Sequence, residues 1–132
     1  MSDTVRIHFL AQKCDQRPRT QMMSFLITTP GGKVIAIDGG NKQDTEYFHG
    51  YIEALLGPKP HIDFWFLTHP HDDHTDVLYE MLRRFPDDFT VGKLIVNGCK
   101  LSCNNRLCEG FCFIYSNRFS FKIRGLHVYI AL

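Results

Sequence analysis

The sequence predicts a layered α/β fold, with a mixed sheet and helices on one face of it. Alternating strands and a hairpin signal occupy the first 40 residues, and two helical patterns then alternate with short apolar strands. The resulting order is strand, strand, strand, helix, strand, helix, strand. That order is typical of a sheet covered by helices on one side. The 132 residues, 44% of them hydrophobic, can bury a sizeable core.

The predicted strands begin at the N-terminus. Val5, Ile7 and Phe9 alternate with Arg6 and His8, which indicates a half-buried strand with His8 facing solvent. A polar loop follows over residues 11–21. Two strands, 22–29 and 33–38, are joined by Pro-Gly-Gly, a strong hairpin signal. Further strands are expected at 62–67 and 94–96.

Two amphipathic helices are predicted between those strands. The first spans 44–56, with Asp44 as its N-cap and Gly57 and Pro58 as its stop. His49 lies off its apolar stripe and is expected to be exposed. The second spans 77–85, with one apolar face, and ends before Pro86.

A dense group of metal-ligand residues lies between the fourth strand and the second helix. The chain reads Thr-His-Pro-His-Asp-Asp-His-Thr-Asp from residue 68 to 76. His69 and His71 are separated by one residue, so both imidazoles can point the same way, and Asp73 and His74 offer further donors. Ligands in α/β layers usually bind at the carboxyl ends of strands. A lone loop histidine or a helix-capping aspartate has a simpler explanation, but this grouping favours a metal site.

These residues resemble the metallo-β-lactamase-fold hydrolases. His69, His71, Asp73 and His74 match the family signature H-x-H-x-D-H, and the strand ending in Asp38, Gly39 and Gly40 matches the family's Asp-Gly-Gly. The resemblance covers about residues 4 to 98 and is closest in wording to the branch related to competence-type DNA-uptake hydrolases. Thr75, Asp76 and Val77 stand where many members have a glycine pair.

The resemblance implies a fold and a chemistry. The fold would be the N-terminal half of an αββα sandwich, since the full sandwich needs on the order of 200 residues. His69 and His71 would bind a first ion, and Asp73 and His74 a second. The ions would be zinc, with manganese or iron as alternatives, and a metal-bound hydroxide would attack the substrate. Asp73 would help to orient that hydroxide, Asp38 would orient the site without being a ligand, and the two glycines would permit close backbone approach.

The family's remaining ligands have no counterpart downstream. His127 is the only imidazole after His74, and it lacks the flanking residues of a family ligand. We therefore expect a truncated hydrolase of doubtful activity alone. The alternative is a non-catalytic module that binds a metal or a partner, and a nucleic-acid-binding protein ranks last.

The chain changes character after about Asn97, which divides it into 1–98 and 99–132. The first part has ten Lys and Arg against thirteen Asp and Glu, whereas the second has five against one. Four of the five cysteines, Cys99, Cys103, Cys108 and Cys112, also lie in the second part. Three explanations stay open: a divergent β region, a structural zinc site, or a sequence out of the family's reading frame, which the abrupt change favours.

Several expectations concern partners and location. The substrate would be a small molecule or a phosphodiester, with nucleic acid considered only as a substrate. The N-terminus lacks the apolar core of a secretion signal and no run of residues suits a membrane span, so a cytoplasmic protein without a membrane partner is expected. A half-sandwich would leave apolar sheet surface uncovered, which favours self-association.

Overall fold

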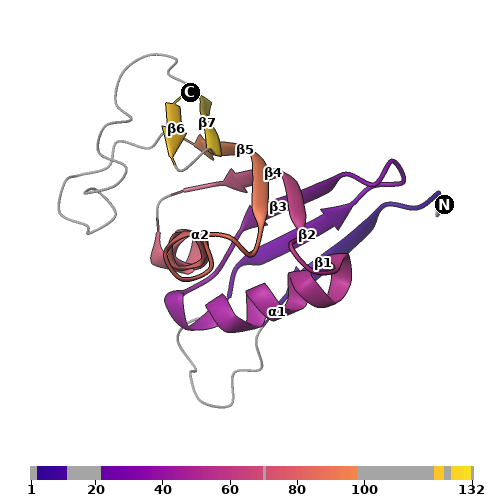
Figure 1. The fold of residues 1–132 in the computed structure, drawn as a ribbon, viewed down its shortest axis with the longest axis horizontal. Coiled ribbons are helices and arrows are strands. Elements are labelled where there is room, and N and C mark those ends of the chain that lie inside the picture. The colour runs from indigo at the N-terminus through magenta and orange to yellow at the C-terminus, as the bar shows by residue number, and fades with distance from the viewer. Residues whose placement is uncertain (1–2, 12–21, 70, 98–120, 124–125, 132) are drawn as a thin grey trace.

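The computed structural model describes residues 3–11, 22–69, 71–97, 121–123 and 126–131 (Figure 1). Its helices are a short 3-10 helix, η1 (Lys42–Asp44), and the α-helices α1 (Thr45–Leu56) and α2 (Asp72–Arg84). Its strands are β1 (Arg6–Leu10), β2 (Ser24–Thr28), β3 (Val34–Asp38), β4 (His61–Leu67), β5 (Thr90–Asn97), β6 (Phe121–Ile123) and β7 (Leu126–Ala131). Among these described residues, no helix is both long and apolar enough to cross a membrane.

All the described strands belong to one mixed sheet in the order β1-β2-β3-β4-β5-β7-β6. The first three are antiparallel neighbours, and β3, β4, β5 and β7 run parallel. Parallel neighbours need crossover connections, which α1 provides between β3 and β4 and α2 between β4 and β5. The predicted fold class, a mixed sheet with helices on one face, is confirmed.

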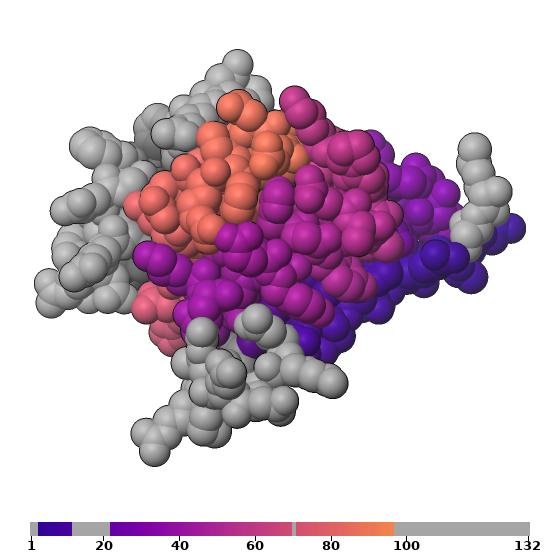
Figure 2. Space-filling model, turned by 60° about the horizontal axis from the view of Figure 1, so that its bottom comes forward, coloured from indigo at the N-terminus to yellow at the C-terminus, as the bar shows by residue number. Residues whose placement is uncertain are grey.

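The core lies between the sheet and the two helices. Leu26, Ala36, Trp65 and Leu94 are fully buried and form one cross-strand row. They share a single cluster with side chains from both helices, so α1 and α2 cover the same face. Phe48 of α1 stacks on Trp65 with the ring centres 5.1 Å apart. Figure 2 shows this side of the molecule, with residues of α1 in purple to magenta at its centre.

The hairpin and the helix ends follow local chemistry. Gly32, with φ of 75°, donates its amide to the Thr29 carbonyl at 2.9 Å, which closes the predicted turn between β2 and β3. Asp44 occupies the predicted N-cap position of α1. Its carboxylate accepts a hydrogen bond from the Asn41 backbone amide at 2.9 Å, but it accepts no capping hydrogen bond from the amides of α1. α2 begins at Asp72, five residues before the predicted start, because acidic residues suit the first turn of a helix even without apolar periodicity.

Two predictions about histidines were wrong. His8 lies on the helix-covered face, beside Leu26 in the register, and its Nδ1 is 2.8 Å from the Tyr51 hydroxyl of α1. The apolar residues Ile7 and Phe9 of β1 are instead 67% and 60% exposed, and Val5 just before the strand is 56% exposed. The alternation in β1 was correct and the assignment of its faces was inverted.

His49 is the second histidine that differs from its prediction. Its side chain is only 12% exposed and stacks on Phe85, with ring centres 4.2 Å apart and an interplanar angle of 7°. Phe85 follows α2 directly, so this contact comes from the neighbouring helix and is invisible in the pattern of α1 alone. An isolated helix pattern therefore underestimates the burial of its flanking residues.

The C-terminal segment contributes two strands to the sheet. β7 pairs with β5 in parallel and β6 pairs with β7 in antiparallel orientation. Both strands lie in the part 99–132, for which a divergent β region was one of the explanations left open. The four cysteines of this segment lie outside the described residues.

Candidate metal centre

Asp38 ends β3 in a conformation that few residues adopt. Its φ is 56°, in the left-handed region where aspartate and asparagine are tolerated better than most side chains. Its carbonyl accepts the indole Nε1–H of the buried Trp65 at 2.9 Å, which ties the turn to β4. A side chain of β4 therefore holds the left-handed backbone of Asp38 in place.

Gly39 and Gly40 let α2 approach this turn. A Cβ atom on Gly39 would lie 2.9 Å from the Cβ of Val77, closer than real side chains approach. The Val77 amide donates to the Gly40 carbonyl at 3.2 Å, so the two backbones are in direct contact. Gly40 has φ of 111°, which a residue with a Cβ rarely adopts. These glycines bring the start of α2 against the end of β3.

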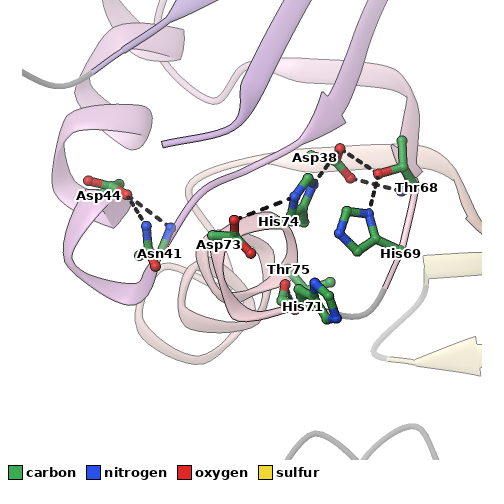
Figure 3. A network of polar contacts seen from close by, with 9 residues as sticks. All are labelled: Asp38, Asn41, Asp44, Thr68, His69, His71, Asp73, His74 and Thr75. Atoms are coloured by element: carbon green, nitrogen blue, oxygen red, sulfur yellow. Dashed lines mark hydrogen bonds and ion pairs between the residues drawn. The ribbon is translucent and has the colours of Figure 1, made fainter. Parts of the chain in front are cut away.

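The carboxylate of Asp38 joins three elements at this point (Figure 3). Its Oδ1 accepts the Thr68 amide at 2.8 Å, and its Oδ2 accepts the Thr68 hydroxyl at 2.7 Å and His74 Nδ1 at 2.8 Å. Asp38 is only 5% exposed, so these bonds satisfy a carboxylate that would otherwise be buried without partners. Asp38 therefore orients both the residue after β4 and the first turn of α2.

These bonds determine which imidazole nitrogens carry protons. His74 Nδ1 must donate to the carboxylate, which leaves the lone pair of a neutral ring on Nε2. The Thr68 hydroxyl gives its one hydrogen to Asp38, so toward His69 Nδ1, at 3.0 Å, it acts as an acceptor. His69 Nε2 is then also left with a lone pair. Both rings present Nε2 as the free donor atom for a metal.

Thr68 is the member of this hydrogen-bond network that the sequence did not single out. It relays the orientation of Asp38 to His69, although a hydroxyl next to a histidine motif has many other roles in proteins. Its position at the end of a buried strand, immediately before His69, was the available signal. A threonine at such a position can satisfy a neighbouring carboxylate and histidine together.

The four predicted ligands lie close together. The ring centre of His69 lies 4.6 Å from the ring centre of His71 and 3.7 Å from that of His74. Asp73 Oδ2 lies 3.6 Å from His74 Nε2, and the Asp73 side chain is 42% exposed. His71 occupies the N-cap position of α2, and its carbonyl accepts the amides of His74 and Thr75.

The donor chemistry suits zinc, but the side chains are not arranged around one point. Within the described ranges, no group of three or more His, Cys, Asp or Glu side chains is placed to hold a metal ion. Two imidazoles on one tetrahedral zinc hold their ring centres about 5 Å apart, given Zn–N distances of about 2.0–2.1 Å. His69 and His71 nearly meet that spacing, whereas His69 and His74 pack too closely and would have to separate.

Negative charge surrounds the start of α2. Burial, and then the neighbouring carboxylate of Asp72, raise the pKa of Asp76 above its ordinary value. Asp73 adds a further carboxylate in the same first turn. This local potential favours a cation over an anion next to the imidazoles.

Comparisons of the chain with protein-family models, with curated proteins and with solved structures give no match.

Proposed function

We propose that this chain is a metal-dependent hydrolase of the metallo-β-lactamase type. His69 and His71 would hold one ion, and Asp73 and His74 a second, with zinc as the expected metal and manganese or iron as alternatives. The observation that supports this most is the network from Asp38 through Thr68 to His69 and directly to His74. Such carboxylate–histidine pairing is the arrangement that orients metal ligands in proteins.

The protein's own residues would position the reaction. Zinc, when bound, supplies Lewis acidity toward a scissile carbonyl or phosphoryl oxygen and lowers the pKa of water. Asp38 fixes the ring of His74, and Thr68 fixes the ring of His69. Asp73, which is half-exposed beside His74 Nε2, would accept a hydrogen bond from an incoming water.

The substrate would be a small molecule or a phosphodiester, and nucleic acid enters only as a substrate. Because the five cysteines are an odd number, a complete disulfide framework is not expected, and we propose a cytoplasmic location.

A non-catalytic metal-binding module is the second candidate, and one observation favours it. No described group of side chains provides three donors for one ion. Two protein ligands per ion would hold the metal weakly, because catalytic zinc sites normally have three. Such a module would bind one equivalent of metal with low affinity and would not hydrolyse a substrate.

Metal content is the first test. Zinc binding by calorimetry and mass spectrometry should be lost in a variant that combines His69→Ala, His71→Ala and His74→Ala. His61→Ala is the matched control, because its exposed imidazole lies at the opposite end of β4 and contacts Thr90. Unchanged zinc binding in the triple variant, or equal loss in the control, refutes the metal centre.

Hydrolysis separates the two candidates. Generic phosphodiester and ester substrates should be turned over by zinc-loaded protein, and Asp38→Asn should reduce zinc affinity by about 10- to 100-fold, as expected for a ligand-orienting residue. Asp44→Asn is the control, since Asp44 is equally buried but caps Asn41 away from the histidines. One weak equivalent of zinc with no turnover identifies the binding module instead.

A further inference from the structure

The sheet face opposite the helices is apolar across five strands. We call it the open face and define it by Ile7, Phe9, Phe25, Ile27, Ile35, Ile37, Phe64, Phe66 and Ile95. Strand pairing arranges these residues in two cross-strand rows. The first row is Phe9, Phe25, Ile37, Phe66 and Ile95. The second is Ile7, Ile27, Ile35 and Phe64, and it continues into Lys93.

The described helices leave this face uncovered. Both of them pack against the alternate residues of the same strands, around Trp65 and Leu26. Ile7 and Phe9 are more than half exposed, whereas the inner members are half-buried. Phe9 contacts Phe25 edge to face, with the ring centres 4.9 Å apart. Contiguous apolar surface of this extent marks an interaction site in soluble proteins.

The charges at the face exclude a strongly charged partner. Its nine defining residues carry no charge, and Lys93, which follows Phe64 in the second row, lies 5.9 Å from the centre of the Phe64 ring. An acidic or basic partner would therefore find no opposite charge among the residues of the open face. The complementary surface must be another apolar one.

The two rows complement each other. Three of the five residues of the first row are phenylalanine, whereas three of the four apolar residues of the second are isoleucine. A two-fold axis parallel to the rows would place the aromatic row of one copy on the aliphatic row of the other, and the reverse. Self-complementarity of this kind is what an isologous dimer requires.

We propose that the open face binds a second copy of this chain, sheet against sheet, in a closed two-fold dimer. Packed sheets keep their strands within about 30° of each other and lie about 10 Å apart. With Val5 included, the face offers on the order of 600 Å² per copy, close to the roughly 800 Å² per partner of a standard interface. The dimer does not depend on the proposed metal chemistry, because the histidines lie between the carboxyl end of β4 and the first turn of α2.

The mass in solution tests the proposal. Sedimentation equilibrium over a wide concentration range should give twice the chain mass for the wild type. The double variant Ile7→Lys/Phe9→Lys should weaken dimerisation on the order of a hundredfold or more, since lysine heads would be buried between apolar sheets. Both positions are more than half exposed in the single chain, so the monomer should tolerate them. Leu55→Lys/Tyr79→Lys is the matched control on the helices, and it should keep the dimer.

Ile27→Lys separates packing of the open face from pairing along the β1 edge. Ile27 lies on β2, inside the sheet, so its substitution should dissolve a face-packed dimer and spare an edge-paired one. Circular dichroism establishes that the variant is folded, and the double variant of β1 decides the question if it is not. A wild-type monomer at all concentrations overturns the proposal, as does an oligomer that survives the β1 double variant. Zinc-free and zinc-loaded wild type should have the same mass, whatever the hydrolase assays give.

Discussion

The two faces of the sheet are built from alternate residues of the same strands, and both are apolar. On β2, β3 and β4, Leu26, Ala36 and Trp65 are fully buried, while Phe25, Ile37 and Phe66, each next to one of them in sequence, are only half-buried. The difference comes from α1 and α2, which cover one face. Apolarity of a strand residue therefore predicts that it can be buried, and the covering layer decides whether it is.

Residue size distinguishes the faces where apolarity does not. Ala36 lies between Leu26 and Trp65 on the covered face, and its small side chain leaves room for Phe48 to stack on the indole. The open face has isoleucine on both sides of that alanine. A mixture of large and small residues indicates packing against helices, and uniformly large residues indicate a flat surface suited to another sheet.

The largest expected effect tests this comparison directly. Trp65→Ala should lower the free energy of unfolding by about 3–5 kcal/mol, because it leaves a cavity under Phe48. Phe66→Ala should cost about 1–2 kcal/mol when both are measured by urea denaturation on the monomeric Ile7→Lys/Phe9→Lys background. Equal losses would mean that the open face is as well packed as the covered one.

A second comparison concerns glycines on the two sides of the helix layer. Gly39→Ala should destabilise the protein by about 1–3 kcal/mol, because the new methyl group would clash with Val77 and push α2 away. Gly50→Ala, on the exposed side of α1 with no atom near its added Cβ, should stabilise by about 0.5–1 kcal/mol. Thermal melting gives both signs, and a stabilising Gly39→Ala would refute the close approach of β3 and α2.

A buried carboxylate on α2 gives a pH-dependent test of the covered side. The two hydrogen bonds from Arg83, with the positive charge of Lys42 nearby, hold the pKa of Glu80 below its ordinary value of 4.5. Its stabilisation is thus present above that value and lost as pH falls through the lower, folded-state pKa. Glu80→Gln should cost about 1–2 kcal/mol at neutral pH, with the difference from wild type shrinking in acid.

The control for Glu80 is Glu53→Gln on α1, whose carboxylate is far more exposed. It should change the unfolding free energy little at any pH. A Glu80→Gln cost that stayed constant from neutral pH into strong acid would show that the ion pairs contribute nothing.

The smallest effect is expected where the sheet rim meets solvent. Lys33 is exposed and forms an ion pair with Asp63 at 2.8 Å. Burial raises the pKa of Asp63, but hydrogen bonds from Lys33 and from the Val34 amide bring that pKa below its ordinary value. Lys33→Met should cost at most about 0.5 kcal/mol, because exposed ion pairs are screened by water. Lys59→Met serves as control, and a loss above about 1 kcal/mol would contradict this view.

The sequence predicted what local spacing encodes. The hairpin at Gly32 and the two helices depend on neighbours in the chain, and the structure confirms them. His69, His71, Asp73 and His74 lie close together for the same reason, but they are not arranged around one ion. The faces of β1 were not predictable, because alternation gives the period of burial and not its direction. Likewise Thr68 and His49 acquired their roles from residues far away, Asp38 and Phe85.

Asp38 bonds to residues 30 and 36 positions farther along the chain. The histidine cluster thus acquires its shape only once β3, β4 and α2 have docked, and fraying of any one of them dismantles it. A ligand that binds the cluster would bind only when β3, β4 and α2 are docked, so it should raise the melting temperature of the whole domain.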